Sequence, residues 1–439
     1  MAENFYHERW LTITEKRNAV VGIVGLGYVG LPLSLSFAEA GFRVIGFDID
    51  PTKIKLLNNR QTYIAHIREG RIRGAIDDGG LEATSDFSRA SEADALIICV
   101  PTPLTKNGEP DVSHIINTRD ALLPHLRAGQ LLSLESTTYP GTTDELLCPP
   151  IRKRGFIIGH NFFVVYSPER EDPGNPVYDT KNIPKVLGGH TRMCTKIGIA
   201  LYRQVIGAMV EVSSTRVAEM VKLVENTYRL VNIALANELK MVADHMGLNI
   251  IEVINGAATK PFGFHPFYPG PGIGGHCIPI DPFYLTWKAK TFGTTSRLID
   301  LAGEINDSMP GWVISKLEKA LAKFGKTIQG ASILALGVTY KKNIDDVRES
   351  PALEVMKLLR DRGAKLSFSD PHVETLPDFL GEEGDLKSQP VSWEILGNQD
   401  AVVLLTDHSA FDYEFIRAYS RLIIDTRSAF GLGPNIIKA

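Results

Sequence analysis

The sequence has few or none of the features that mark several common protein classes. Its four cysteines are far apart and form no C-x-x-C pair, so we expect neither a disulfide framework nor a metal site. No apolar run approaches the roughly 18 residues of a membrane span, and the N-terminus does not resemble a signal peptide. Positive charge is not in excess, with 47 Lys and Arg against 51 Asp and Glu. We therefore expect a cytoplasmic protein that binds neither membrane nor nucleic acid.

Short apolar strands alternate with helical stretches at both ends of the chain. The expected strands lie at residues 19–24, 43–47, 95–100 and 131–134, and again at 331–336, 364–368, 400–405 and 422–424. This alternation is typical of βαβ units and of parallel sheets covered on both faces. The sequence predicts an α/β fold with two Rossmann-like, doubly wound parallel-sheet domains.

The region between these domains has a helical pattern. Apolar residues recur at three- and four-residue steps over 217–246, which predicts one long helix. Further helices are expected around 250–257 and 298–306, with a loop rich in Gly, Pro and aromatics at 260–282. Three domains are predicted: a first α/β domain at 1–212, a small all-helical domain at 213–310 and a second α/β domain at 311–439. The long helix is expected to connect the two α/β domains.

A glycine fingerprint follows the first strand. Gly25, Gly27 and Gly30 stand between a strand and a helix, and Asp48 ends the next strand. In this setting the glycines permit a tight turn, the approach of a pyrophosphate and close helix packing, and the carboxylate binds the adenine ribose. Because a carboxylate repels a 2′-phosphate, the fingerprint predicts NAD rather than NADP.

Two further patterns suggest chemistry. Lys222 and Asn226 are four residues apart on one helical face, although spacing alone favours a solvated lysine and a tolerated asparagine. Glu225 and Arg229 have the same spacing and are expected to form a surface ion pair. Cys277 follows a glycine-rich loop that would expose its thiol, which makes it a candidate nucleophile. The remaining cysteines, Cys99, Cys148 and Cys194, are interpreted as structural.

Seven motifs occur together in one order. They are Gly25-x-Gly27-x-x-Gly30, Val100-Pro101-Thr102-Pro103, Ser136-Thr137-Thr138-Tyr139-Pro140-Gly141-Thr142-Thr143, Ser167-Pro168-Glu169-Arg170, Lys222-x-x-x-Asn226, Gly274-Gly275-His276-Cys277 and Asp345-Asp346-x-Arg348-Glu349-Ser350-Pro351. In this register the chain resembles the UDP-glucose/GDP-mannose dehydrogenase family from about Val20 to Arg427. The resemblance implies an NAD-binding first domain, a central domain with a catalytic Cys loop and a UDP-sugar-binding last domain. It also implies NAD-dependent, four-electron oxidation of a sugar C6 alcohol to a carboxylate.

The resemblance assigns roles to individual residues. Cys277 would hold the substrate as a thiohemiacetal and then a thioester, and Lys222 with Asn226 would stabilise oxyanions. Asp281 would orient the Lys and, with a water near Thr137, serve in proton transfer, while Glu169 would be the base for hydrolysis of the thioester. The implied catalytic residues are Cys277, Lys222, Asn226, Asp281, Glu169 and Thr137. The expected cofactor contacts are Gly25, Gly27, Tyr28, Val29, Gly30, Asp48, Lys53, Thr102, Thr137 and Arg348. The expected substrate contacts are Glu169, Arg170, Lys222, Asn226, Lys260, His265, Gly274, His276, Lys341 and Arg427.

The identity of the sugar depends on departures within the motifs. His276 stands where UDP-glucose enzymes of the family typically have Ser, which suggests an N-acetylhexosamine. Residues 166–174 and 268–272 are more similar to the UDP-N-acetylglucosamine branch than to the UDP-N-acetylmannosamine branch, and the manno epimer stays open as the alternative, with UDP-glucose behind it. The product would supply surface polysaccharide synthesis.

The resemblance also implies a homodimer or a higher homo-oligomer formed through the central helical domain. Members of the family place an Arg upstream of the nucleophile, where it reaches a neighbouring subunit. No Arg occurs between Arg229 and Cys277, so Lys260 or His265 is expected to substitute for it.

Two other functions compete with this hypothesis. A 2-hydroxyacid dehydrogenase of the 6-phosphogluconate type also joins a Rossmann domain to helices and uses a Lys and an Asn, but it leaves Cys277 and the last domain without a role. A nucleotide-sugar sensor without activity is disfavoured because the reactive side chains are all present.

Overall fold

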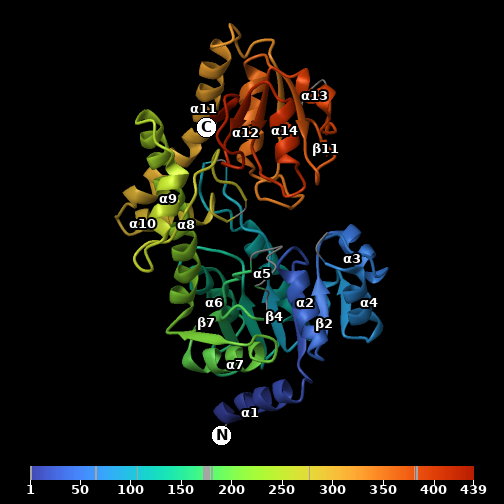
Figure 1. Cartoon of the computed structure of the whole chain (residues 1–439). Coiled ribbons are helices and arrows are strands. Elements are labelled where there is room, and N and C mark those ends of the chain that lie inside the picture. Colours follow the sequence, from blue (N-terminus) through green and yellow to red (C-terminus); the bar gives the residue numbers. More distant parts are fainter. Residues whose placement is uncertain are drawn as a thin grey trace. The chain divides into compact units, whose positions relative to one another are not determined.

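Two large sheets, one of eight strands and one of five, organise the described part of the chain (Figure 1). The computed structural model describes residues 2–64, 67–105, 107–171, 178, 181–275, 277–379, 381 and 384–439. The chain divides into two compact units: unit 1 holds residues 1–225 and 287–294, and unit 2 holds residues 226–286 and 295–439. The first part of the central helix groups with unit 1 and the rest with unit 2. The division into three domains stays a prediction.

The sheet of unit 1 has the strand order β3-β2-β1-β4-β5-β6-β7-β8 among the described residues. Its strands are β1 Val20–Val24, β2 Arg43–Phe47, β3 Leu81–Thr84, β4 Ala95–Ile98, β5 Leu131–Leu134, β6 Phe163–Tyr166, β7 Lys185–Gly189 and β8 Met209–Val212. Neighbouring strands are parallel except β6 and β7, which are antiparallel. The first six strands therefore follow the doubly wound order of dinucleotide-binding domains.

Helices connect these strands in unit 1. They are α1 Ala2–Glu15, α2 Gly30–Glu39, α3 Pro51–Asn58, α4 Glu69–Asp77, α5 Ser113–Leu122, α6 Cys148–Lys153 and α7 Arg192–Tyr202, with short turns of other helix types at Phe87–Ser91, Leu123–His125 and Thr143–Leu147. Alternate strand residues belong to different cores. Ile23 and Ile97 pack in one hydrophobic cluster, whereas Val24 and Ile98 pack in another. Burial on both faces explains why these strands are continuously apolar.

Unit 2 contains a sheet whose strands are all parallel, in the order β10-β9-β13-β14-β15. Its strands are β9 Ser332–Leu336, β10 Lys365–Ser369, β13 Ala401–Leu404, β14 Ile423–Asp425 and β15 Ile436–Lys438, and a two-stranded ribbon joins β11 Thr375–Leu376 to β12 Leu386–Lys387. The helices of this sheet are α12 Pro351–Asp361, α13 Trp393–Gly397 and α14 Tyr413–Tyr419. The predicted second doubly wound domain is confirmed.

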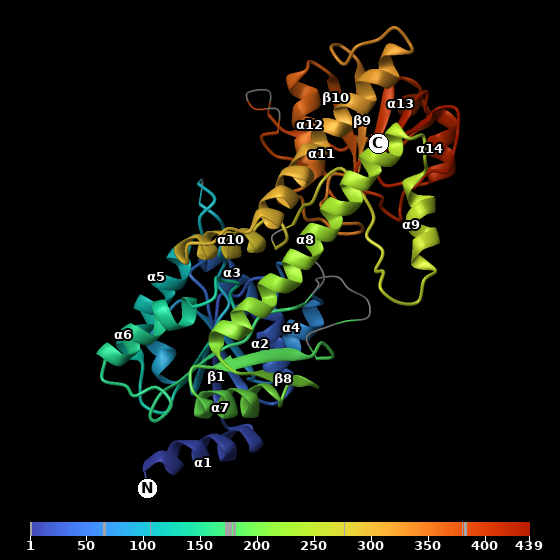
Figure 2. The same ribbon diagram turned by 90° about the vertical axis from the view of Figure 1, so that its left-hand side faces the viewer.

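The predicted long helix is present as α8, which runs unbroken from Thr215 to His245 (Figure 2). It is followed by α9 Ile250–Ala258, α10 Asp281–Thr291 and α11 Arg297–Ala322. None of the described helices is both long enough and apolar enough to cross a membrane.

Candidate active site

The turn after β1 is crowded at two of its glycines and open at the third. A Cβ added at Gly25 would lie 2.8 Å from the Cys99 carbonyl oxygen, and one at Gly30 would lie 1.9 Å from the Gly25 carbonyl oxygen. At Gly27 nothing lies within 4 Å of such an atom. The crowded glycines let strand, turn and α2 pack closely, while Gly27 leaves space beside the N-terminus of α2, where backbone N–H groups favour an anion. The turn fits the pyrophosphate of NAD, and its residues Tyr28 and Val29 come directly before α2.

Asp48 is held beside this turn. Its side chain is buried, and its Oδ2 accepts a hydrogen bond from the Leu26 N–H at 2.8 Å. The same oxygen lies 3.3 Å from the Lys53 Nζ, and Oδ1 accepts the Asp50 N–H at 2.9 Å. A carboxylate oxygen can accept two hydrogen bonds, so among the described residues Oδ1 keeps one position for a ribose hydroxyl. The two predicted cofactor residues Asp48 and Lys53 thus adjoin each other.

The loops after β4 and β5 are tied together at the carboxyl edge of the sheet. The Thr102 hydroxyl donates to the Thr137 carbonyl oxygen at 2.7 Å, and the Ser136 hydroxyl donates to the Val100 carbonyl oxygen at 2.7 Å. Ligands of doubly wound sheets bind at this edge. The two threonines predicted to contact the cofactor therefore lie side by side where such a ligand binds.

Glu169 belongs to a buried charge network in unit 1. The Lys185 Nζ lies 3.1 Å from its Oε2 and 2.9 Å from the Glu135 Oε2. Burial alone would raise the pKa of Glu169, but Lys185, the Glu171 N–H and Lys222 hold it below its ordinary value. Burial raises the pKa of Glu135. Glu169 is thereby kept ionised, as a general base requires.

Lys222 and Asn226 are both buried on α8, at 9% and 4% exposed. The interpretation of Lys222 as a solvated lysine, which its spacing alone favours, is therefore wrong. The Asn226 Nδ2 donates to the Asp281 Oδ2 at 2.5 Å, and Asp281 is the first residue of α10. Among the described residues the Lys222 ammonium has no hydrogen-bond or ion-pair partner. A buried, unpartnered ammonium is able to stabilise an oxyanion.

Cys277 lies at the entrance to α10 and is exposed, unlike the other cysteines. Its carbonyl oxygen accepts the Asp281 N–H at 2.8 Å, which connects the thiol-bearing residue to the carboxylate by one turn. The loop before it packs closely on a segment about 75 residues further along the chain: a Cβ at Gly274 would lie 2.5 Å from the Glu349 carbonyl oxygen and 2.7 Å from the Pro351 Cδ. Only glycine fits here. His276 lies outside the described residues.

The carboxyl ends of β9 and β13 are neighbours at the reversal of strand order in unit 2, where doubly wound sheets bind ligands. Lys341 follows β9 at this reversal. Arg427 follows β14, donates from Nε to the Leu405 carbonyl oxygen at 2.8 Å, and has its pKa lowered by burial. A Cβ at Gly270 would lie 2.7 Å from the Arg427 Nη1, so this glycine makes room for the guanidinium. Arg348 is exposed and pairs with Asp346 at 2.6 Å.

The other predicted substrate residues lie nearer the surface. Arg170 pairs with Glu225 at 2.6 Å. The expected ion pair of Glu225 with Arg229 is therefore wrong, because the nearer guanidinium comes from the loop after β6. The Lys260 Nζ lies 4.9 Å from the centre of the Phe262 ring, and the His265 Nδ1 is 3.1 Å from the Tyr228 hydroxyl. Both side chains are exposed, and their roles stay predictions.

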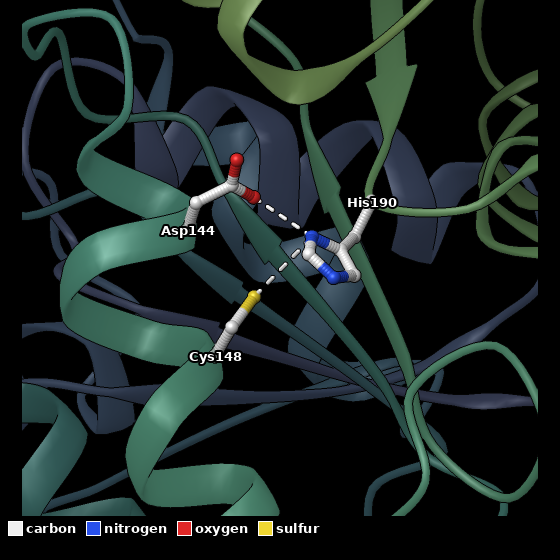
Figure 3. A group of neighbouring side chains, drawn as sticks. All are labelled: Asp144, Cys148 and His190. Atoms are coloured by element: carbon white, nitrogen blue, oxygen red, sulfur yellow. Dashed lines mark hydrogen bonds and ion pairs between the residues drawn. The ribbon is translucent and has the colours of Figure 1, made fainter.

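One side-chain cluster in unit 1 has the composition of a metal site (Figure 3). The His190 Nδ1 lies 2.7 Å from the Asp144 Oδ1 and 3.7 Å from the Cys148 Sγ. Arg152 donates to the His190 Nε2 at 2.6 Å, which makes Nε2 an acceptor and leaves the ring proton on Nδ1, donated to Asp144. Arg216 also pairs with Asp144 at 2.8 Å. Burial raises the pKa of Cys148 to about 12, so the thiol stays protonated. The cluster is satisfied by hydrogen bonds, and its two guanidinium groups oppose a cation.

Comparison with known proteins gives the chain its family. The NAD binding, central and UDP binding domains of the UDP-glucose/GDP-mannose dehydrogenase family match residues 19–206, 216–308 and 334–431. The chain belongs to this family of NAD-dependent nucleotide-sugar dehydrogenases, and NAD is its cofactor. This assignment replaces the 6-phosphogluconate-type alternative.

Three relatives illustrate the range of sugars within the family. The chain is 35% identical to the UDP-N-acetyl-D-glucosamine 6-dehydrogenase of Pseudomonas aeruginosa, over 89% of this chain and 91% of that one. It is 34% identical to the NDP-N-acetyl-D-galactosaminuronic acid dehydrogenase of Ralstonia solanacearum, over 93% and 95%. The solved structure of UDP-D-ManNAc dehydrogenase from Pyrococcus horikoshii matches with a TM-score of 0.85 and 33% identity, over 94% and 97%. All three names specify an N-acetylhexosamine or its uronic acid.

The sequence patterns do not reveal the buried residues that support the site. Lys185 begins a strand that the apolar pattern did not reveal, and Glu135 directly follows β5. Glu219 on α8 accepts hydrogen bonds from the Gly141 and Thr143 N–H groups at 2.5 and 2.9 Å, which anchors the loop after β5. The one available signal was a charged residue directly after a buried strand.

Proposed function

We propose that this chain oxidises the C6 hydroxyl of UDP-N-acetyl-D-glucosamine to the carboxylate, with two NADH formed per sugar. The proposal rests above all on Lys222, Asn226 and Asp281. Lys222 places on α8 a buried ammonium that has no partner in the described part of the chain, and the Asn226 amide four residues on is bonded to the first carboxylate of α10. Cys277 stands one turn before that carboxylate. These are the groups that a two-step oxidation through a covalent intermediate requires.

The proposed sequence retains the aldehyde on the enzyme. NAD, when bound, supplies the hydride acceptor for each oxidation. Lys222 and Asn226 stabilise the alkoxide that forms as the C6 hydroxyl passes its proton to Asp281. The Cys277 thiolate adds to the aldehyde to form a thiohemiacetal, whose oxidation leaves a thioester. Glu169 takes a proton from the water that hydrolyses it, releasing the carboxylate and the Cys277 thiolate.

Four further residues are given binding roles in this proposal. Lys341 and Arg427 bind the UDP moiety at the carboxyl edge of the unit 2 sheet, Arg348 contacts the cofactor, and Thr137 positions a water. His276 supports an N-acetylhexosamine, and the sequence of residues 166–174 and 268–272 favours the gluco epimer. UDP-N-acetyl-D-mannosamine is the alternative, since relatives of similar identity carry different N-acetylhexosamines in their names. Four cysteines without a disulfide among the described residues, one of them the proposed nucleophile Cys277, suit the cytoplasm.

The test of the reaction uses purified enzyme, NAD and four sugars under one set of conditions: the UDP derivatives of N-acetylglucosamine, N-acetylmannosamine, N-acetylgalactosamine and glucose. We expect the highest kcat/KM with UDP-N-acetylglucosamine and discrimination against UDP-glucose of up to about 10⁴-fold, because a site built to pair with an acetamide rejects a sugar without one. A higher kcat/KM for UDP-glucose would refute the N-acetylhexosamine class, and a higher value for the manno epimer would refute only the gluco assignment.

The test of the intermediate replaces the nucleophile. We expect Cys277→Ser to abolish steady-state turnover, whereas the matched variant Cys194→Ser, at a buried position on α7, retains it. The wild-type enzyme should form two NADH per sugar and release no aldehyde to a trapping amine. One NADH per sugar, or trapped aldehyde, would contradict the covalent mechanism.

We also propose that the chain forms a homo-oligomer through α8. Apolar residues on one face of this helix recur at three-, four- and seven-residue steps and are each at least 41% exposed: Val217, Val224, Tyr228, Leu235, Leu239 and Val242. Much of the periodicity that predicts the helix thus belongs to a face that no core of the described chain covers. A contiguous apolar face of this kind marks an interface.

A further inference from the structure

Lys185 is a buried lysine that bridges two glutamates at the carboxyl edge of the unit 1 sheet. Lys185 is the first residue of β7, and its side chain is 5% exposed. Glu135 follows β5, and Glu169 follows β6. The Nζ lies 2.9 Å from the Glu135 carboxylate and 3.1 Å from the Glu169 carboxylate. Three adjacent strands therefore bring one ammonium and two carboxylates together, and Glu169 is the most exposed of the three, at 15%.

The hydrogen bonds of Glu169 are unequally divided between its two oxygens. Oε1 accepts the N–H groups of Arg170 at 2.7 Å and of Glu171 at 2.6 Å, which fills both of its acceptor positions. Oε2 accepts from Lys185 alone among the described residues. One acceptor position is left on the carboxylate, and its direction is set by the bond that Lys185 makes to the same oxygen.

Glu135 is held on its far side. Its Oε1 accepts the Tyr202 hydroxyl, which lies 2.9 Å from the Ser133 Oγ, and all three side chains are fully buried. Glu135 therefore cannot turn toward solvent, and its carboxylate fixes the position of the Lys185 ammonium. Such a fixed cation favours the ionised form of the neighbouring carboxyl.

We propose that Lys185 is a positioning residue for hydrolysis of the thioester: it keeps Glu169 ionised and aims the free acceptor position of its Oε2 at the attacking water. This inference rests on the proposed function, because it gives Glu169 the role of base. In the step itself, the water oxygen bonds to the acyl carbon as its proton passes to Glu169 Oε2, and the bond from carbon to Cys277 Sγ breaks with the electron pair going to sulfur. No oxidation state changes.

Several titratable or charged groups face this carboxyl from the surrounding elements. They are Lys185 on β7, Glu135 after β5, Cys99 after β4 and Lys222 on α8, while Tyr202 on α7 faces Glu135 and the Arg170 guanidinium pairs with Glu225. Burial raises the pKa of both the Cys99 thiol and the Tyr202 hydroxyl, so neither titrates with Glu169. The acid limb of the decay rate, that is, its fall at low pH, is therefore expected to follow protonation of Glu169, whose pKa lies below its ordinary value.

The experiment measures decay of the acyl-enzyme directly. Enzyme is mixed with NAD and UDP-N-acetylglucosamine, quenched with acid at intervals, and the mass added to the intact protein is followed at a series of pH values. Removing Lys185 alone would leave Glu135 buried without a cation, so the decisive variant is the double change Lys185→Met with Glu135→Gln. We expect this double variant to form both NADH and to accumulate the thioester at pH 7. The pH below which its rate of thioester decay falls, the acid limb of the profile, should be higher than in the wild type by about 1–3 pH units.

Two further variants separate positioning from a structural role. Lys185→Arg keeps the cation, so its thioester should decay with the same acid limb as in the wild-type enzyme. Lys181→Met removes an exposed lysine from the segment before β7 and should leave the limb unchanged. A double variant that decays with the wild-type pH profile would overturn the role of Lys185. Failure of the wild-type enzyme to form a Cys277 thioester would instead refute the proposed function.

Discussion

Lys240 is a buried lysine with no charge partner in the described part of the chain, and we expect Lys240→Met to stabilise the chain. It lies on α8, is 6% exposed, and has no hydrogen bond or ion pair among the described residues. The nearby carboxylates are already paired, Asp244 with Lys316 and Asp425 with Lys438, each at 2.6 Å. Burial lowers the pKa of Lys240 from 10.5 to about 8.

The size of the effect follows from this shift. A lowering from 10.5 to about 8 corresponds to roughly 3 kcal/mol at about 1.4 kcal/mol per pH unit. The unfolded chain binds the proton more tightly, so the cost is complete at pH 7 and shrinks as pH rises from about 8 to 10.5. Methionine fills the same space without a charge. The stabilisation should therefore approach 3 kcal/mol at pH 7 and fall to less than half of that at pH 9.5.

The assay is urea unfolding of the full chain at both pH values, followed by circular dichroism. Lys316→Met is the matched control, because this lysine on α11 has its carboxylate partner and its loss should lower the free energy of unfolding. Equal or lower stability of Lys240→Met at pH 7 would refute the argument, as would a gain that does not depend on pH.

Three further predictions concern the cofactor, the loop after β5 and the oligomer. Asp48→Asn should raise the kcat/KM for NADP relative to NAD, measured side by side, because it removes the carboxylate that repels a 2′-phosphate; an unchanged ratio would contradict the placement of Asp48 at the ribose. Glu219→Gln should lower the free energy of unfolding by about 1–3 kcal/mol, because an amide NH₂ cannot accept the N–H groups that the carboxylate accepts. Since burial raises the pKa of Glu219 to about 7, its ionisation costs stability progressively from about pH 4.5 to 7, and a urea series over this range should show that slope in the wild type and not in the variant. Leu239→Glu should dissociate the oligomer in sedimentation velocity, whereas a change at Lys181, far along the chain from α8, should not.

The sequence determined the fold class and the residues of the cofactor turn, since both depend on local patterns. Continuous apolar strands predicted buried parallel sheets, and β2 and β5 begin and end where the pattern places them. The glycine fingerprint carries its function in its spacing, because each glycine acts within one turn. The order of the seven motifs along the chain was then enough to indicate the family, although it carries no information on distances between residues.

Only the tertiary structure decided which charges are buried together. Helical spacing favoured a solvated Lys222, because a period of 3.6 residues says which side chains share a face but not what covers that face. The same limit hid the exposed side of α8. The Lys185 ammonium meets Glu135 and Glu169 because β5, β6 and β7 are neighbours in the sheet. Such contacts join residues 16 and 50 positions apart, and the pKa of Glu169 depends on them because burial and fixed charge act through space and not along the chain.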